Sequence, residues 1–277
     1  MYEFGFIGFG SMATMLIDGF IRYAGVSASN IIVTRNDKNR LSQISEAFPG
    51  IHTANTVPEV VCNAKRVLIC VKPVEVKSVL LEMKPYISGD AHIISLAGMV
   101  SLNNILSIVD CKVSKLIPTA VSETGEGISL VCYSSGVAES DRISFEQYIE
   151  KLGKVKVIDE KDIAFAAELT SCNPGFIASI LDNMTRAAAF HTTSFSMEEI
   201  AEMVTYTAYT TTKLLFEKKW NHNTLIKRVA TKGGITEEGV AVFNEMLPDV
   251  FQAVFSKTLG KRAAVEKRIN DDFPEQK

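Results

Sequence analysis

The sequence predicts an α/β domain followed by an all-helical domain. In residues 1–159, short strand-like apolar runs alternate with helical patterns, which is typical of a doubly wound parallel sheet. In residues 160–277, helical patterns follow one another with almost no strand-like run. We therefore expect the domain boundary between residues 159 and 160.

Composition limits the classes of partner. The chain has 277 residues and is 47% apolar, which is enough for a sizeable core. Its net charge is −3 and no dense basic run is present, so nucleic acid is not an expected partner. No apolar run reaches about 18 residues, so we expect no membrane span. No signal or transit peptide is visible at the start of the chain.

The cysteines and histidines favour a reducing compartment. Five cysteines are scattered along the chain, and the four histidines are far apart in sequence. This pattern predicts neither a disulfide framework nor a metal site, and it is typical of a cytoplasmic protein.

The first strand ends near Ile7, and a glycine-rich turn leads from it into a helix. Gly8, Gly10 and Ala13 have the G-x-G-x-x-A spacing. The first glycine permits a tight turn, the second lets the backbone approach a pyrophosphate, and the alanine allows close packing of helix and strand. The N–H groups of the helix start would face the phosphates. We therefore predict a Rossmann-type domain whose cofactor contacts include Gly8, Phe9, Gly10, Ser11, Met12 and Ala13. The alternative is an ordinary glycine-rich turn.

The end of the second strand selects the cofactor. Residues 30–34 form an apolar strand, and an NAD-binding protein usually carries an acidic residue just after it. This chain has Thr34, Arg35 and Asn36 there, and further cations follow. A hydroxyl and cations suit a 2′-phosphate, so we favour NADP, while Asp37 leaves NAD open. The alternative for Arg35 is a solvated loop charge.

The other elements of the first domain follow in order. We expect strands at 51–53, 66–71, 91–96, 113–118, 128–133 and 154–158, and helices at 41–48, 57–63, 76–83, 102–109 and 144–152. The carboxyl ends of strands line the ligand crevice of such a sheet. Val71, Lys72 and Pro73 end one buried strand, and Ala97 and Gly98 end the next. We count these residues among the cofactor contacts.

The second domain is predicted to hold helices at 163–170, 176–190, 197–220 and 225–229, with a last long helix from Glu237. Residues 204–212 are unusually rich in β-branched and aromatic side chains for a helix. Either this helix is buried within the chain, or it lies in a dimer interface where its hydroxyls find partners across the seam. We favour dimerisation.

Several motifs, taken together and in order, resemble those of the pyrroline-5-carboxylate reductase family. They are Gly8-Phe9-Gly10-Ser11-Met12-Ala13, Val71-Lys72-Pro73, Ser95-Leu96-Ala97-Gly98, Leu116-Ile117-Pro118 with Gly125-Glu126-Gly127, Asn173-Pro174, and Gly233-Gly234-Ile235-Thr236. The resemblance implies an NAD(P)H-dependent enzyme that reduces 1-pyrroline-5-carboxylate to proline. It also implies a homodimer built from the helical domains, sometimes assembled further.

The chain departs from the family pattern mainly in its substrate half. The family's P-N-T-P is Pro118-Thr119-Ala120-Val121 here, and its S-G-S-G-P is Thr170-Ser171-Cys172-Asn173-Pro174. On the long helix its Q-T-x-x-G is Tyr206-Thr207-Ala208-Tyr209-Thr210, and the proline of its S-P-G-G is Lys232. These departures bear on the substrate more than on the type of reaction.

Reduction of a C=N bond needs a hydride, a dry pocket and a hydrogen-bond donor to the nitrogen, and the cofactor carries the hydride. Thr236 matches the family's second threonine and is our candidate donor; the alternative is that it caps a helix. Gly233 and Gly234 offer bare N–H groups that would hold a substrate carboxylate. Asp182 falls where the family has Glu, but an exposed surface residue is the default explanation, and we favour it.

Three functions remain after this reasoning. The first is reduction of a cyclic imine acid, the second is a related NADP-dependent reductase with another substrate, and the third is an NADP-binding protein without catalysis. No hydrolase motif of the G-x-S-x-G type is present.

Overall fold

The computed structural model describes residues 1–35, 37 and 41–273, and the chain divides into two compact units. The sheet unit consists of Met1–Cys172 together with the C-terminal stretch that begins at Leu259. The helical unit consists of Asn173–Thr258. Each unit is described by itself below.

This division differs from a single boundary between residues 159 and 160. Ile163 and Ala167 are buried in the core of the sheet unit, and so are Ile269 and Phe273 near the end of the chain. Apolar packing therefore attaches the stretch before Asn173 and the C-terminal stretch to the sheet.

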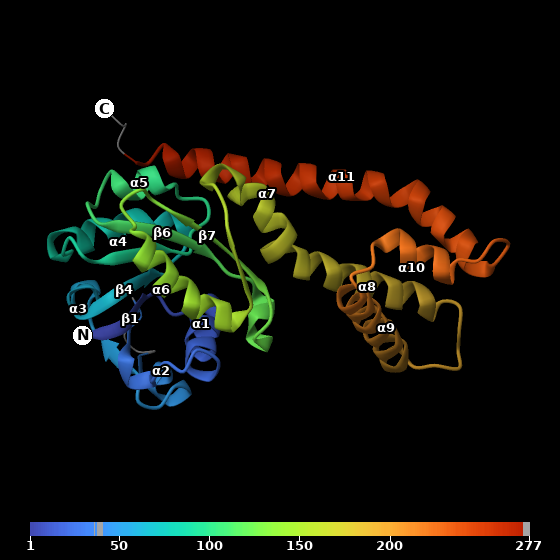
Figure 1. Ribbon diagram of the computed structural model, residues 1–277, viewed down its shortest axis with the longest axis horizontal. Helices are drawn as coiled ribbons and strands as arrows, with labels where there is room; N and C mark the ends of the chain where they lie inside the picture. The colour runs from blue at the N-terminus through green and yellow to red at the C-terminus, as the bar shows by residue number, and fades with distance from the viewer. Residues whose placement is uncertain (36, 38–40, 274–277) are drawn as a thin grey trace. The chain divides into compact units, whose positions relative to one another are not determined.

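An eight-stranded sheet forms the centre of the sheet unit (Figure 1). Its strands are β1 (Tyr2–Ile7), β2 (Ile31–Thr34), β3 (His52–Ala54), β4 (Ala64–Ile69), β5 (His92–Ser95), β6 (Lys112–Ile117), β7 (Ile128–Tyr133) and β8 (Lys154–Val157). They lie in the order β3-β2-β1-β4-β5-β6-β7-β8, and the first six are parallel. The order of those six is that of dinucleotide-binding folds, so the predicted Rossmann-type sheet is confirmed.

The last two strands reverse direction. β7 is antiparallel to β6, and β8 is parallel to β7. The connection from β6 to β7 contains the short 3₁₀ helix η5 (Ala120–Thr124), and a parallel crossover needs a longer connection. The strand positions follow from the sequence pattern, whereas this reversal does not.

Helices cover both faces of the sheet (Figure 1). On one face, a core cluster includes buried side chains from α1 (Ser11–Arg22), α2 (Leu41–Ala47) and α6 (Glu139–Ile149). The opposite cluster contains α3 (Val57–Asn63), α4 (Val76–Met83), α5 (Leu102–Leu106), α7 (Ile163–Ala167) and the end of α11 (Ile235–Asn270). Short elements complete the unit: 3₁₀ helices η1 (Ala28–Asn30), η3 (Pro73–Glu75), η4 (Lys84–Tyr86), η6 (Glu150–Leu152) and η7 (Glu160–Asp162), and the π-helix η8 (Glu168–Cys172).

The apolar stripe predicted for α1 is buried. Leu16 and Phe20 are at most 1% exposed and pack in one cluster with Phe4 and Phe6 of β1. The rings of Phe4 and Phe20 stack with their centroids 4.4 Å apart. Burial of each such side chain contributes about 1.5–3 kcal/mol, so this packing holds α1 against β1.

The helical unit has almost no core of its own. It consists of α8 (Asn173–Ala189), α9 (Met197–Lys218), α10 (His222–Val229) and the first part of α11. All of its residues are described, and only Thr185 and Ile200 among them are buried. Phe216 and Met246 are 70% and 61% exposed. A surface this rich in apolar side chains is typical of an interface with another protein.

The tyrosine- and threonine-rich helix α9 is not buried within the chain, so that interpretation is wrong. Tyr206 and Tyr209 are 66% and 56% exposed. The hydroxyl of Thr210 donates to the carbonyl of Tyr206, and that of Thr212 donates to the carbonyl of Ala208. These hydroxyls are thus satisfied by the helix's own backbone, and the aromatic rings are left exposed.

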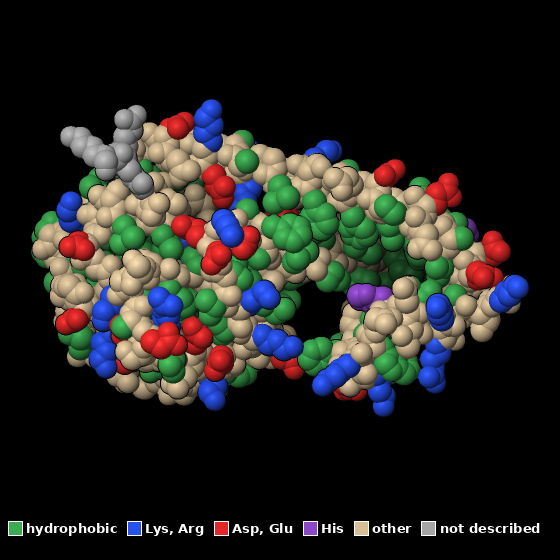
Figure 2. Space-filling model, turned by 45° about the horizontal axis from the view of Figure 1, so that its top comes forward, with side chains coloured by type: hydrophobic (Ala, Val, Ile, Leu, Met, Phe, Trp, Pro, Cys, Tyr) green, Lys and Arg blue, Asp and Glu red, His purple; other side chains and the backbone are tan. Residues whose placement is uncertain are grey.

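A groove between α8 and α11 is lined mainly by apolar side chains of the helical unit. It has a volume of about 680 Å³, and Ile180, Met184, Phe243, Val250 and Phe251 are among its lining residues. Figure 2 shows hydrophobic side chains gathered along a hollowed part of the surface. This groove offers a second apolar surface a place to bind.

Within residues 1–35, 37 and 41–273, no helix combines the length and the apolar character that crossing a membrane requires. The same residues contain no cluster of three or more His, Cys, Asp or Glu side chains arranged to bind a metal ion. All five cysteines are free thiols.

Candidate cofactor and substrate site

Backbone hydrogen bonds join the carboxyl ends of four strands of the sheet unit. The Gly8 N–H donates to the carbonyl of Thr34 at 2.9 Å, and the Cys70 N–H donates to that of Ile7 at 2.8 Å. The Leu96 N–H donates to the carbonyl of Ile69 at 3.1 Å. The segments that follow β1, β2, β4 and β5 therefore meet at one edge. It is here, between β1 and β4, that the strand order reverses, which is where such sheets bind ligands.

The glycine-rich turn has the geometry that the motif requires. Gly8 has φ +96°, and a Cβ atom on it would lie 3.0 Å from the Cys70 carbonyl group and from a methyl group of Val71. Only glycine fits this turn without strain. A Cβ on Gly10 would meet no protein atom within 4 Å, so this position faces open space. Ala13 is fully buried where α1 packs on the sheet.

The start of α1 presents unopposed N–H groups. Gly10 is the N-cap and supplies no side chain to cap the helix, and the first turn holds no acidic residue. Ser11 is exposed, and Met12 is partly exposed. The positive end of the helix dipole therefore lies beside the open space at Gly10, which fits a pyrophosphate.

At the end of β2, the structure gives different results for Thr34 and Arg35, which were both predicted to contact the cofactor. Thr34 is 3% exposed, and its hydroxyl donates to the carbonyl of Ala54 at 2.9 Å. That hydrogen is therefore already used to hold β3, and the expected contact of the Thr34 hydroxyl with a 2′-phosphate is corrected. The Nε atom of Arg35 is buried and has no hydrogen-bond partner among the described residues. A buried unpaired guanidinium nitrogen fits a phosphate ligand. Asn36 lies outside the described residues.

In the segment after β4, the carboxylate of Glu75 holds the backbone in place. The Lys72 N–H donates to the side chain of Glu75 at 3.0 Å, and Pro73 occupies the first position of η3. Val71 packs against the core, while the Lys72 side chain is exposed. This segment lies next to the Gly8 turn, as its predicted role requires.

The segment after β5 packs closely against β6 and α11 at Gly98. The Ala97 N–H donates to the buried hydroxyl of Ser95. A Cβ on Gly98 would lie 3.1 Å from the Arg262 guanidinium and 3.2 Å from Ile117. Glycine at this position is therefore explained by close packing within the sheet unit.

In the helical unit, the N–H groups predicted to be bare are engaged. Gly233 has φ +75°, and its N–H donates to the carboxylate of Glu237 at 2.7 Å. The Gly234 N–H donates to the carbonyl of Thr231 at 2.9 Å. The expectation of two free donors is thus corrected: a carboxylate of the chain itself already occupies Gly233. A substrate carboxylate would have to displace it.

Thr236 is exposed in the first turn of α11. The helix begins at Ile235, one residue earlier, so Thr236 is not the N-cap. Lys232 is exposed in the preceding turn. Asp182 forms an exposed ion pair with Arg186 one turn further along α8, at 2.9 Å, which is an ordinary surface contact.

Two segments that depart from the family pattern touch each other within the sheet unit. The hydroxyl of Ser171 donates to the carbonyl of Pro118 at 2.9 Å. Among the described residues, three side chains in or near these segments have a buried polar atom without a hydrogen-bond partner: Thr119, Ser122 and Glu168. Such atoms are rare in folded proteins and need an explanation, for which a polar ligand is one candidate. The sequence singled out the first segment at Thr119 but did not point to Glu168.

The fold and this edge define a dinucleotide-binding protein of the α/β class. Residues 3–98 match a family model described as NADP oxidoreductase, coenzyme F420-dependent, and residues 160–266 match one described as pyrroline-5-carboxylate reductase dimerisation.

Two proteins that are similar over almost the whole chain define its family more narrowly. A Bacillus subtilis (strain 168) protein named pyrroline-5-carboxylate reductase 3 is 32% identical over 270 residues, covering 97% of this chain and 98% of that protein. ComE operon protein 4 of the same organism is 27% identical, covering 92% and 93%. The chain belongs to the pyrroline-5-carboxylate reductase family.

A solved structure shares the fold. The crystal structure of the Plasmodium falciparum pyrroline carboxylate reductase with NADP bound has a TM-score of 0.83 and 20% identity, and the match covers 97% of this chain and 98% of that one.

Proposed function

We propose that this protein catalyses the NADPH-dependent reduction of the C=N bond of 1-pyrroline-5-carboxylate to give L-proline. The observation that carries the proposal is the carboxyl edge of the sheet, where the Gly8 turn, the uncapped start of α1 and the unpaired Nε of Arg35 lie together in a chain of this family. The bound cofactor supplies the hydride in such a reaction.

The chain's own residues would bind and orient the cofactor. The open space at Gly10 and the N–H groups of the first turn of α1 would hold the pyrophosphate. Arg35 would pair with the 2′-phosphate, which favours NADPH over NADH. The segments at Val71 and Ala97 would border the site from the neighbouring strands.

The substrate side of the proposal rests on the turn before α11. The exposed hydroxyl of Thr236 would donate a hydrogen bond to the imine nitrogen. The Gly233 N–H already holds the Glu237 carboxylate, which supports the idea that this turn accepts a carboxylate. We assign Thr236 the catalytic role, and Gly233 and Gly234 the binding of the substrate carboxylate.

We also propose that the protein functions as a homodimer or a higher homo-oligomer through residues 160–277, with cofactor binding in residues 1–159. The unburied helices of the helical unit support this proposal, because a second copy would cover their apolar side chains. The five free thiols are consistent with the cytoplasm.

The test measures oxidation of NADPH and NADH, each with and without 1-pyrroline-5-carboxylate. We expect oxidation that requires the imine and is faster with NADPH. Thr236→Ala should lower kcat, and Arg35→Ala should raise the KM for NADPH at least tenfold while changing that for NADH little. A wild type that binds NADPH but never oxidises it with this imine would contradict the proposal.

A second candidate is a related NADP-dependent reductase with another substrate. The altered segments favour it, because Thr119 within one of them, and Ser122 and Glu168 close to them in sequence, have buried polar atoms without a partner among the described residues. A panel of cyclic imines that differ in ring size and in polar substituents distinguishes the two. Faster turnover of a more polar imine would favour the second candidate. NADPH binding with no turnover on any imine would indicate a protein without catalysis.

A further inference from the structure

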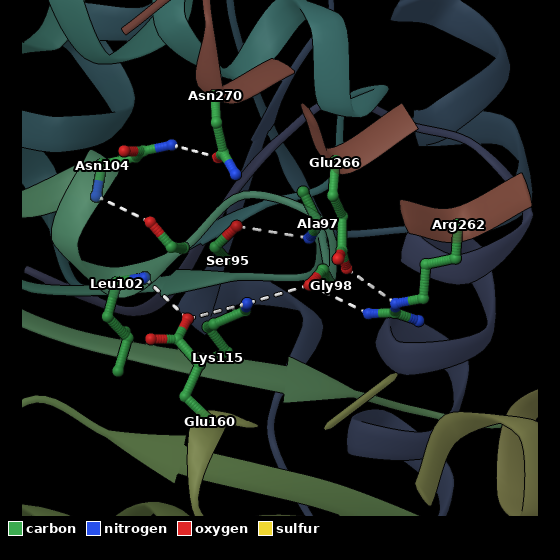
Figure 3. A network of polar contacts seen from close by, with 11 residues as sticks. Ser95, Ala97, Gly98, Leu102, Asn104, Lys115, Glu160, Arg262, Glu266 and Asn270 are labelled. Carbon is green, nitrogen blue, oxygen red and sulfur yellow. Dashed lines mark hydrogen bonds and ion pairs between the residues drawn. The ribbon is translucent and has the colours of Figure 1, made fainter. Parts of the chain in front are cut away.

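The carbonyl oxygen of Gly98 accepts hydrogen bonds from two cationic side chains. The Lys115 Nζ donates to it at 2.9 Å, and the Arg262 Nη2 donates to it at 3.1 Å (Figure 3). Lys115 is on β6, Arg262 is near the end of α11, and both belong to the sheet unit. Two charged donors on one neutral carbonyl fix the orientation of that peptide group.

Two carboxylates complete the cluster. One oxygen of Glu160 accepts from the Lys115 Nζ at 3.0 Å and from the Leu102 N–H at 2.7 Å. The Glu266 carboxylate accepts from the Arg262 Nε at 2.7 Å. Two positive and two negative charges thus surround the Gly98 carbonyl (Figure 3). We call Lys115, Glu160, Arg262 and Glu266 the Gly98 clamp.

Packing does not explain the choice of Lys115. Its side chain is 2% exposed on a strand whose neighbours Leu116 and Ile117 are buried and apolar. Apolar residues in place of a buried ion pair are often neutral or stabilising. We therefore infer that the clamp is present to hold the loop after β5 in one fixed position.

The backbone on the other side of this peptide is free. Because the peptide group is planar and trans, the Met99 N–H points away from the clamp when the Gly98 carbonyl points into it. Neither the Gly98 N–H nor the Met99 N–H has a hydrogen-bond partner among the described residues. The loop after β5 thus presents unused donors at the edge of the sheet that holds the Gly8 turn.

We propose that Lys115, Glu160 and Arg262 are positioning residues, which orient the Gly98–Met99 peptide so that its N–H is available to donate to the bound cofactor. The inference rests on the proposed function in one respect: it takes the loop after β5 as part of the cofactor site. None of the three residues touches the cofactor in this proposal.

The test is a fluorescence titration with NADPH in the absence of any imine, on full-length Lys115→Met and Arg262→Met. Each variant should bind NADPH about tenfold more weakly, as expected for the loss of one charge-assisted hydrogen bond. Lys115→Arg keeps the donor and should restore most of the affinity. The Val100 N–H donates to the Ala97 carbonyl at 3.1 Å across this loop. Its hydrogen exchange, measured without cofactor, should accelerate in both Met variants but not in Lys115→Arg.

Lys112→Met is the matched control. Lys112 is the first residue of the same strand and pairs with Asp141 at 2.9 Å, outside the Gly98 clamp. We expect it to bind NADPH as the wild type does. If Lys115→Met does not fold, Arg262→Met decides the question, because that side chain is 14% exposed and sits on the last turns of a helix.

Folded Lys115→Met and Arg262→Met proteins that bind NADPH as tightly as the wild type would overturn the inference. So would equal losses of affinity in Lys112→Met and Lys115→Met, since the effect would then be general destabilisation. A wild type that binds NADPH but does not reduce the imine would end the proposed function alone, because the titration needs no turnover.

Discussion

The two units of this chain meet the need to bury apolar surface in different ways. In the sheet unit, Phe4, Phe6 and Phe20 are fully buried between strands and helices of the same chain. In the helical unit, Phe243 and Phe216 are 53% and 70% exposed, although the helices are well formed. The comparison teaches that regular secondary structure does not imply a self-sufficient domain. The sheet unit buries its apolar side chains within one chain, whereas the helical unit leaves most of its own exposed.

The largest expected effect comes from charging the groove of the helical unit. Phe243→Asp combined with Val250→Asp should convert the oligomer to monomers, because unpaired charges cannot be buried in an apolar interface. We expect at least a thousandfold weaker association in analytical ultracentrifugation, with loss of hydrogen-exchange protection in α8 and α9. Leu81→Asp is the control, since Leu81 of the sheet unit is also 53% exposed. An unchanged oligomer in the double variant would refute the comparison.

The second largest expected effect comes from shortening a side chain in the core of the sheet unit. Phe20→Ala should lower the free energy of unfolding of the sheet unit by about 3–5 kcal/mol, through lost burial and a cavity. Because this core lies within one chain, the loss should not depend on protein concentration. Phe243→Ala should instead make thermal unfolding more dependent on concentration. Denaturation at two protein concentrations a hundredfold apart separates the two cases, and a concentration-dependent loss in Phe20→Ala would contradict the distinction.

The sheet unit should also respond to acid through His92. Burial, followed by the charge of Arg66, lowers the pKa of His92 to about 4, and its Nε2 lies 2.6 Å from the Ser114 hydroxyl. Because the folded pKa is below the unfolded value of 6.5, the unfolded state binds more protons between these values. Stability is therefore lost as the pH falls from about 6.5 to about 4.

We expect this histidine to account for about 2 kcal/mol between pH 7 and pH 4.5. Urea denaturation at the two pH values measures it, and His92→Gln should remove most of that part of the pH dependence. An equally steep pH dependence in the variant would show that other groups are responsible.

The smallest expected effect is local to the helical unit. The Ser196 hydroxyl accepts from the Glu199 N–H, and the Glu199 carboxylate accepts from the Ser196 N–H, which caps the start of α9. Ser196→Ala should cost about 1 kcal/mol, while Ser196→Asp should keep the cap. Hydrogen exchange in the first turn of α9 measures this change. A similar loss in both variants would mean that the cap is not what stabilises the turn.

Local patterns predicted much of this fold. Apolar runs located the strands to within one or two residues, and Gly8, Gly10 and Ala13 located the turn into α1, because both depend on neighbours in sequence. The reversal at β7 and the attachment of Ile269 and Phe273 to the sheet could not be predicted in this way, since they depend on contacts between distant residues.

The same distinction holds for the candidate site. The backbone positions could be read from the motif, but the hydrogen-bond partners could not. The Thr34 hydroxyl is used by Ala54, and the Gly233 N–H is used by Glu237. Lys115 carried a signal that was available, because it is a charged residue directly followed by the apolar Leu116 and Ile117 in a strand-like run. Its partners Glu160 and Arg262 are far away in sequence and carried none.

The discontinuous sheet unit has a consequence for synthesis on the ribosome. Its last segment, with Ile269 and Phe273, is translated after the entire helical unit. Until that segment emerges, the nascent sheet exposes the apolar surface that these side chains cover, and Gly98 lacks its contact with Arg262. Folding of the sheet unit therefore finishes only after Ile269 and Phe273 have left the ribosome, so a chain that stalls before that point exposes this apolar surface and is prone to aggregate.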